Sequence, residues 1–283
     1  MSTIMSLIKR YPVLTYYALT FVISWGGTLM AIGLGGILGT QEVPEAQLPF
    51  VYLAVLLGPS VAGLLLTSLC DGRAGFRELF SRLLRWRAGA RWYAVALLTA
   101  PLLITAILYA LSLASPAFLP AIVTADDKVS LLLTGMVMGL GVGFFEEIGW
   151  TGFVLPRLRQ RYSPLTTGLI MGLLWGLWHF PLFSGSTNSS GAVPPALYLA
   201  VLLFSFLPPF RALMVQVYDR TGSLLVAVLM HVPLAASQMI LNPVISGAQL
   251  VTYDLVFAAA LWICVAAVQG LQILPRQARG VLS

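Results

Sequence analysis

Two adjacent glutamates, Glu146 and Glu147, lie inside an otherwise apolar stretch, GMVMGLGVGFFEEIGWTGF. Ionisable side chains at the depth of a bilayer are costly, so they mark a functional site by default. Two neighbouring carboxylates cannot both ionise cheaply in a medium of low dielectric constant. We therefore expect at least one of them to bind a proton more tightly than usual, as a general base near neutral pH requires. The alternative is a structural pair bonded to neighbouring helices.

The chain has only two histidines, and both lie inside apolar stretches: His179 in LLWGLWHFPLF and His231 in SLLVAVLMHVPL. At the helical rise of about 1.5 Å per residue, Glu147 and His231 lie equally far from the basic ends of their segments, and His179 lies somewhat farther. Three helices thus bring a glutamate and two histidines to a similar level. Such a set can activate water with Glu146 as the base, or bind a metal ion through Glu146, His179 and His231 with one position left for water.

Two further patterns support this site. Trp175 stands four residues before His179 and shares its helix face, where it would orient the imidazole, exclude water or simply pack. Small residues repeat at four-residue spacing ahead of the glutamates, at Gly135, Gly139 and Gly143. That spacing lets another helix approach closely, so we expect it to hold the glutamates against their partner helices.

The composition places these residues in a membrane. Of 283 residues, 59% are hydrophobic and 9% charged, whereas soluble domains carry about 25% charged residues. A cytosolic enzyme, a disordered chain and a secreted disulfide scaffold are therefore excluded. Residues 1–283 are expected to form a single integral membrane domain, all-α and polytopic, since only helices or closed barrels satisfy the backbone in lipid. About eight transmembrane helices are predicted, over residues 11–38, 50–70, 92–113, 130–155, 165–183, 195–217, 222–241 and 250–273.

Basic residues gather in every second connection and in both terminal segments, which include Lys9, Arg10, Arg276 and Arg279. By the positive-inside rule, this alternation predicts both termini on the cytoplasmic side of the cell membrane. The net charge of +6 follows the membrane, so no nucleic-acid partner is expected. Residues 71–91 are predicted to form a cytoplasmic amphipathic basic loop, with a helix lying on the anionic leaflet. Near Pro208 and Pro209 the sixth span is expected to break or to continue as an interfacial helix.

Three motifs at these residues resemble, in order, those of the CAAX protease and bacteriocin-processing family (CPBP, also called Abi), which includes the Ras-converting CAAX endopeptidases. EEIGWTGFVLPRL is similar to the first family motif, EExxxR. LLWGLWHFP is similar to FxxxH, with Trp175 as the aromatic residue, and LLVAVLMHVPLA is similar to HxxxN. Residues 130–241 are therefore the expected core that carries the motifs.

The resemblance implies eight-helix intramembrane endopeptidases with a central polar, water-filled cavity. By that resemblance Glu146 would activate water with His179, while His231 would help to stabilise the oxyanion of the tetrahedral intermediate. The implied substrate is a membrane-anchored or hydrophobic peptide, and the bilayer is the other partner. No cofactor is certain; a divalent metal such as zinc is the one considered. Nothing in the sequence specifies an oligomer.

Two positions depart from the family motifs. Thr151 replaces the arginine that would stand four residues after Glu147 and neutralise it. Only a hydrogen bond from Thr151 is then expected, with Glu147 protonated. Ala235 replaces the asparagine of HxxxN and removes one oxyanion donor. Gln238, seven residues after His231 on the same helix face, is a candidate replacement.

These departures keep two other functions open. The first is a catalytically impaired protein that retains the CPBP fold and serves as a binding or scaffold protein. The second is a proton-coupled transporter, because intramembrane glutamates and histidines also serve in proton relays. A transporter predicts broken helices in two corresponding halves, and the sequence lacks that symmetry. Peptide hydrolysis is the function that the set of glutamates and histidines favours.

Overall fold

Helices make up nearly all of this structure, a computed structural model that describes the backbone of residues 3–273 and the side chains of residues 4–270. No β-strand occurs between residues 3 and 273, and the predicted all-α class is confirmed. The helices are α1 (Thr3–Arg10), α2 (Pro12–Ile37), α3 (Leu48–Leu83), α4 (Ala90–Ser112), α5 (Ala121–Thr124), α6 (Lys128–Gly149), α7 (Leu155–Leu158), α8 (Pro164–Trp178), α9 (Phe180–Phe183), α10 (Pro195–Phe204), α11 (Leu207–Thr221), α12 (Leu224–Ile240) and α13 (Gly247–Ile273).

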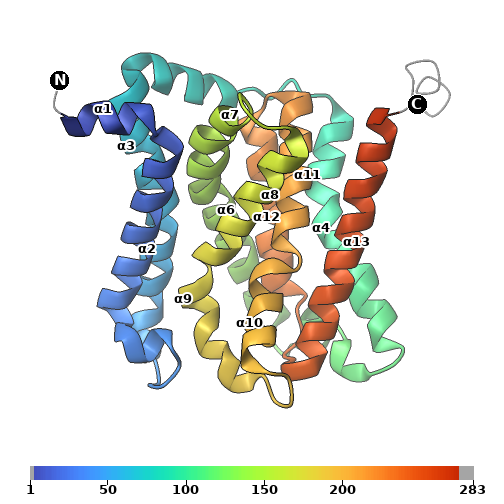
Figure 1. Cartoon of the computed structure of the whole chain (residues 1–283). Coiled ribbons are helices and arrows are strands. Elements are labelled where there is room, and N and C mark those ends of the chain that lie inside the picture. The colour runs from blue at the N-terminus through green and yellow to red at the C-terminus, as the bar shows by residue number, and fades with distance from the viewer. Residues whose placement is uncertain (1–2, 274–283) are drawn as a thin grey trace.

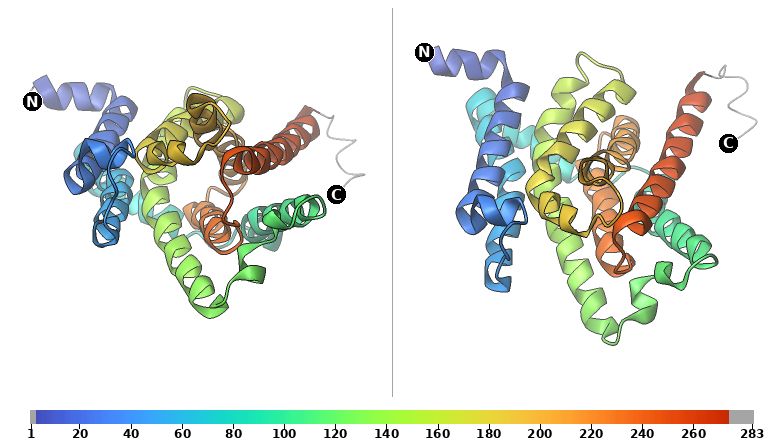
Figure 2. Two further views of the ribbon diagram at one scale, coloured as in Figure 1. Left: turned by 90° about the horizontal axis from the view of Figure 1, so that it is seen from below. Right: turned by 60° about the horizontal axis from the view of Figure 1, so that its bottom comes forward.

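The long helices stand roughly side by side in a bundle (Figure 1). The α2–α3 pair lies at one side, α4 and α13 lie at the other, and α6, α8, α11 and α12 stand between them (Figure 2). The closest packing joins α12 to α6, α2 to α3, α8 to α11, and α12 to α4. The central helices are those that carry the predicted site residues, so the bundle surrounds the site with other helices rather than with lipid.

Six helical segments of the described chain are long and apolar enough to cross a membrane, and a bent helix pair raises this number to seven. The chain is an integral membrane protein. The expected count of eight is not confirmed, because α12 has only 17 residues. At about 1.5 Å per residue such a helix is shorter than the roughly 30 Å hydrocarbon core of a bilayer. The expected central cavity and the side of the membrane on which the termini lie stay predictions.

Two predicted spans contain a break between two helices. The span predicted as 165–183 stops at Trp178, and α8 and the segment after it are bent by 46° around His179. Pro181 in the next turn lacks the backbone N–H that a continuous helix would use. The break expected near Pro208 and Pro209 is confirmed, since α10 ends at Phe204 and α11 begins at Leu207.

The helix with both glutamates ends in a wider turn that the sequence does not predict. Residues Trp150–Val154 form one π-helical turn between α6 and α7. Such single turns occur inside α-helices frequently at functional sites. Here the turn follows the two glutamates directly, and all five of its residues are buried.

Close packing of α6 on α12 depends on the glycines with four-residue spacing. A Cβ atom on Gly143 would lie 2.6 Å from Val232 Cγ2, and one on Gly139 would lie 2.8 Å from both the Val232 carbonyl oxygen and Ala236 Cβ. Both distances are well below van der Waals contact. The predicted packing role of these glycines is confirmed, and it brings the helix of the glutamates against the helix of His231.

Replacing Gly143 with alanine is expected to lower the thermal unfolding midpoint by about 3 °C or more, because the added methyl group forces α6 and α12 apart. Gly141 provides the matched control, since nothing lies within 4 Å of a Cβ atom placed there. Gly141→Ala should leave the midpoint unchanged or raise it through better helix propensity. Equal midpoints for the two variants in a dye-based unfolding assay would contradict the packing argument.

The basic segment 71–91 is helical up to Leu83 and continues α3 instead of forming a separate element. The two parts of α3 meet at Gly72, whose φ of 58° lies in the left-handed region. After this bend α3 turns across the same end of the bundle as α1 (Figure 1). The last residues of α13 lie at that end too (Figure 1). Arg276 and Arg279, used to predict the side of the C-terminus, lie outside the described residues.

Candidate active site

The carboxylate of Glu147 is the centre of a fully buried polar network. Arg211 Nη1 on α11 lies 2.8 Å from Glu147 Oε1 and 3.0 Å from Oε2. His231 Nδ1 on α12 lies 2.7 Å from Oε1. Thr151 in the π-helical turn donates its hydroxyl to Oε2. Three separate segments therefore converge on one carboxylate inside the membrane domain.

Arg211 corrects the expectation drawn from the first motif. Thr151 does supply the predicted hydrogen bond, but Glu147 is not left without a cation, because the buried Arg211 forms an ion pair with it. The positive charge that the family motif places four residues after Glu147 comes here from another helix. A buried charge pair that is well bonded is costly to break, since removal of one partner leaves the other uncompensated.

Two buried charged residues, Arg211 and Asp254, were not among the predicted site residues. Arg211 lies within the span predicted as 195–217, and Asp254 lies near the start of the span predicted as 250–273. Both are buried, with Asp254 4% exposed. The rule that singled out the glutamates, an ionisable residue inside an apolar stretch, applies equally to these two positions and would have found them.

Glu146 is held in a different way from its neighbour. Its Oε2 accepts hydrogen bonds from the indole N–H groups of Trp175, at 2.8 Å, and Trp150, at 3.3 Å. No ion pair to Glu146 occurs among the residues that the structure describes. Its Oε1 accepts no hydrogen bond from the described part of the chain. Glu146 therefore keeps one free acceptor oxygen, which is what proton abstraction from water requires.

Trp175 connects nearly all the site residues. Besides its bond to Glu146, its ring lies 4.3 Å from the Arg211 guanidinium carbon. The ring meets both imidazoles edge to face, with centroid distances of 5.5 Å to His179 and 5.2 Å to His231. Trp175 was predicted either to orient the imidazole or simply to pack. The contacts favour orientation, because one indole positions the carboxylate, the arginine and both histidines.

The two histidines are held through Nδ1, which fixes their tautomers. His179 Nδ1 lies 2.8 Å from the Trp175 carbonyl oxygen. A carbonyl only accepts, so Nδ1 of His179 carries the proton. The carboxylate of Glu147 likewise favours a proton on Nδ1 of His231. Neither Nε2 atom has a hydrogen-bond partner among residues 4–270. Both Nε2 atoms are therefore available to water or substrate.

The predicted site residues are brought together only in part. Glu147, His231 and Thr151 are in direct contact, while Glu146 and His179 are linked to each other through Trp175. Gln238 is not brought into contact with these residues. Its carboxamide oxygen accepts from Asn242 and, at 3.5 Å, from Tyr253. Its suggested role as an oxyanion donor stays an untested prediction without a contact to support it.

The geometry does not form a metal site. No group of three or more histidine, cysteine, aspartate or glutamate side chains is arranged to hold a metal ion in the described chain. The set Glu146, His179 and His231, predicted as ligands if a metal is used, does not form such a group among the described residues, and the use of a metal stays a prediction.

Two comparisons with known proteins find similarity to CAAX prenyl endopeptidases. Residues 128–236 match the family model of the type II CAAX prenyl endopeptidases that are Rce1-like. A stretch of 38 residues is 47% identical to the CAAX prenyl protease 2 of Methanococcus maripaludis. We refer to residues 128–236 as the Rce1-like segment. The second match covers 13% of this chain and 14% of the relative's own length.

The Rce1-like segment contains the whole buried network. It begins with α6 and ends within α12, so it includes both glutamates, Trp175, both histidines and Arg211. The resemblance stated from the three motifs is confirmed at the level of the family. Asp254 lies outside the Rce1-like segment and is not part of the hydrogen-bonded network.

Proposed function

We propose that this protein is an intramembrane endopeptidase that hydrolyses a peptide bond of a membrane-associated substrate by means of water activated by Glu146. The single observation that carries the proposal is the difference between the two adjacent glutamates. Glu146 has a free Oε1, whereas the charge of Glu147 is compensated by Arg211. Two adjacent carboxylates then take different roles. One can exchange protons, and the other stabilises positive charge on its neighbours.

The proposed reaction starts with a water molecule between Glu146 Oε1 and Nε2 of His179. Glu146 removes one proton from this water as its oxygen attacks the carbonyl carbon of the scissile bond. The C=O double bond becomes an oxyanion, which His231 Nε2 stabilises as a donor. The Glu147–His231 contact supports this role, because the carboxylate at Nδ1 holds the imidazole ring in a fixed orientation. The proton held by Glu146 then passes to the leaving nitrogen as the C–N bond breaks.

The proposed substrate class is a membrane-anchored peptide of the prenylated CAAX type. Support comes from the family of residues 128–236 and from the name of the archaeal relative. The site residues lie within a bundle of membrane-spanning helices, so a substrate attached to lipid is delivered at the right depth. The catalytically impaired alternative depends on Ala235, since the missing arginine of the first motif is compensated by Arg211.

The test is a cleavage assay with the purified chain in liposomes and a quenched fluorescent peptide that ends in a prenylated CAAX sequence. The expected result is release of the terminal tripeptide, identified by mass, with much slower cleavage of the same peptide without the lipid group. Absence of cleavage in liposomes that contain folded protein would refute the proposal and favour the non-catalytic alternative.

Metal removal is expected to leave cleavage unchanged. Because no group of three or more histidine, cysteine, aspartate or glutamate side chains in the described chain is arranged to hold a metal ion, we infer that cleavage does not depend on a bound metal. Dialysis against a strong chelator should retain nearly full activity, and elemental analysis should find much less than one metal per chain. Loss of activity that added zinc restores would contradict this inference.

A further inference from the structure

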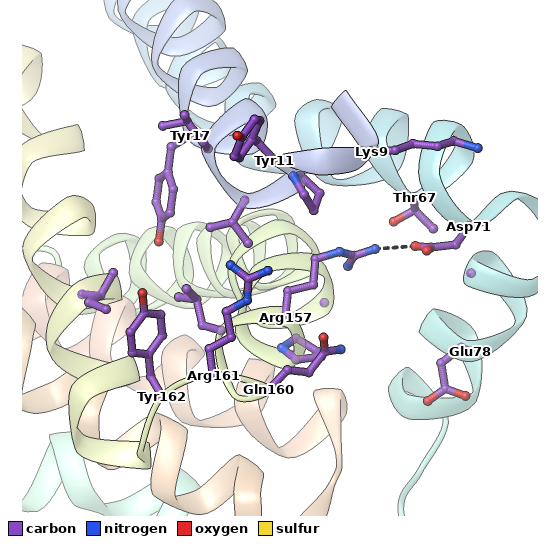
Figure 3. A pocket seen from close by; sticks show the side chains of 18 of the residues that line it. Lys9, Tyr11, Tyr17, Thr67, Asp71, Glu78, Arg157, Gln160, Arg161 and Tyr162 are labelled. Carbon is purple, nitrogen blue, oxygen red and sulfur yellow. Dashed lines mark hydrogen bonds and ion pairs between the residues drawn. The ribbon is translucent and has the colours of Figure 1, made fainter. Parts of the chain in front are cut away.

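A cavity lies at the end of the bundle where α1 and the last part of α3 turn across it. Its volume is about 940 Å³, and its walls come from α1, α2, α3, α7 and the adjacent parts of α8 and α11. None of the residues of the hydrogen-bonded network around Glu146 and Glu147 lines it. The chemistry proposed above therefore leaves this cavity without a role. Figure 3 shows it from close by.

The cavity walls carry an excess of positive charge. Five cationic and two acidic side chains line it, namely Lys9, Arg10, Arg82, Arg157, Arg161, Asp71 and Glu78. Arg157 is paired with Asp71, and Arg82 lies 3.4 Å from Glu78. Three cationic side chains are therefore not matched by an acid. Arg161 forms neither a hydrogen bond nor an ion pair with the described residues.

Hydroxyl donors stand beside the free arginine. Tyr17 is only 7% exposed, and its buried hydroxyl has no hydrogen-bond partner in the described chain. Figure 3 shows this hydroxyl and that of Tyr162 pointing toward each other from opposite walls, with the Arg161 guanidinium directed into the same space. The N–H groups of a guanidinium and the O–H group of a phenol both donate hydrogen bonds to phosphate oxygens. The planar guanidinium of arginine matches the geometry of a phosphate especially well.

The position of the cavity indicates that such a phosphate belongs to a lipid. In α1, Ile4 and Leu7 are exposed beside the basic pair that ends the helix, and near the end of α3 Phe80 and Leu84 are exposed among arginines. Helices with exposed apolar and basic faces lie at the boundary between headgroups and acyl chains. The cavity between them is therefore at headgroup depth, where basic pockets between helices bind anionic lipids.

We propose that this cavity binds the phosphate headgroup of an anionic phospholipid, with Arg161 and the hydroxyl of Tyr17 as its principal contacts. The proposal goes beyond peptide hydrolysis, since a lipid held here would fix α1, α2, α3 and α7 against one another whether or not the site is catalytic. Binding can be measured without peptide substrate, so its outcome is independent of the proposed function.

The test uses the full chain purified in detergent. The protein is titrated with phosphatidylglycerol or with zwitterionic phosphatidylcholine, and native mass spectrometry counts the bound lipid molecules. We expect at least one molecule of phosphatidylglycerol to bind more tightly than phosphatidylcholine. Arg161→Gln should weaken this binding about five- to tenfold, since it removes an unpaired charge at headgroup depth. Tyr17→Phe, which removes only the hydroxyl, should weaken it less but measurably.

The matched control is Arg220→Gln, which removes the same charge from an exposed residue that does not line the cavity. It should change affinity about twofold or less, because exposed charges at a distance are screened. Equal binding of the two lipids, or equal loss in Arg161→Gln and Arg220→Gln, would overturn the proposal. Glycerol phosphate that binds as tightly as the lipid, or a substrate peptide that displaces the lipid from the cavity, would also overturn it.

Discussion

Replacing Glu146 with glutamine is expected to reduce the rate of peptide cleavage about a thousandfold, because a general base contributes about a hundredfold to ten-thousandfold to the rate. Glutamine keeps an oxygen that can accept from Trp175 and Trp150, so the hydrogen bonds that position the side chain are retained. Only the capacity to take a proton from water is lost. The measurement is the initial rate of cleavage of the quenched peptide in liposomes, with folded protein quantified in the same samples.

The neighbouring residue provides the control for this prediction. Glu147→Gln removes the partner of the buried Arg211, and an unpaired buried charge costs about 3–5 kcal/mol. That variant should therefore be strongly destabilised, whereas Glu146→Gln should unfold at nearly the wild-type temperature. The same chemical change at adjacent positions thus separates catalysis from stability. Cleavage by Glu146→Gln at the wild-type rate would refute the proposed role of Glu146 as the base.

Polar groups are rare and costly inside a bilayer, and for this reason the sequence alone indicates Glu146, Glu147 and both histidines as site residues. This reasoning works because each of these residues is surrounded by long apolar runs on both sides. The pairing of partners could not be predicted in the same way. Depth along a helix can be counted at a fixed rise per residue, but which faces meet depends on how the helices are rotated, and a single sequence does not encode that rotation locally.

Arg211 illustrates this limit. It stands two residues after the proline pair of α11, so the sequence indicated a break near the membrane surface instead of a buried cation. The structure begins α11 ahead of these prolines and buries Arg211 completely. Prolines in the first turn of a helix have no hydrogen bond to lose. The same residues that signalled a break therefore start the helix that carries the arginine to Glu147.

The remaining differences have local causes as well. The π-helical turn at Trp150–Val154 could not be predicted, because it is defined by a wider hydrogen-bond pattern and not by residue types. The break at His179 could have been anticipated from Pro181, which restricts the preceding turn. Such a break leaves Nδ1 of His179 bonded to the last turn of α8 through the Trp175 carbonyl. Irregular backbone thus occurs at two of the points where the site is built.

Arg211→Gln is expected to abolish most of the cleavage activity and to destabilise the fold by about 3–5 kcal/mol, since Glu147 would remain buried without its cation. A loss of this size can prevent folding, so the informative measurement is the double variant Glu147→Gln, Arg211→Gln. With both charges removed, the stability penalty should largely disappear, and the coupling between the two positions should be about 2 kcal/mol or more. Thermal midpoints of the four proteins complete this cycle, and additive losses would contradict a direct ion pair.

An arginine at position 151 is expected to compensate for the loss of Arg211. Thr151 stands four residues after Glu147 and already contacts its carboxylate, so an arginine at this position reaches the same oxygen atoms. In the Arg211→Gln background, Thr151→Arg should restore part of the cleavage rate and raise the thermal midpoint. Thr151→Gln in that background is the matched control, since it has a polar side chain without the charge and should restore neither. Equal effects of the two substitutions would show that the site depends on packing at position 151, and that Arg211 does not replace the arginine of the family motif.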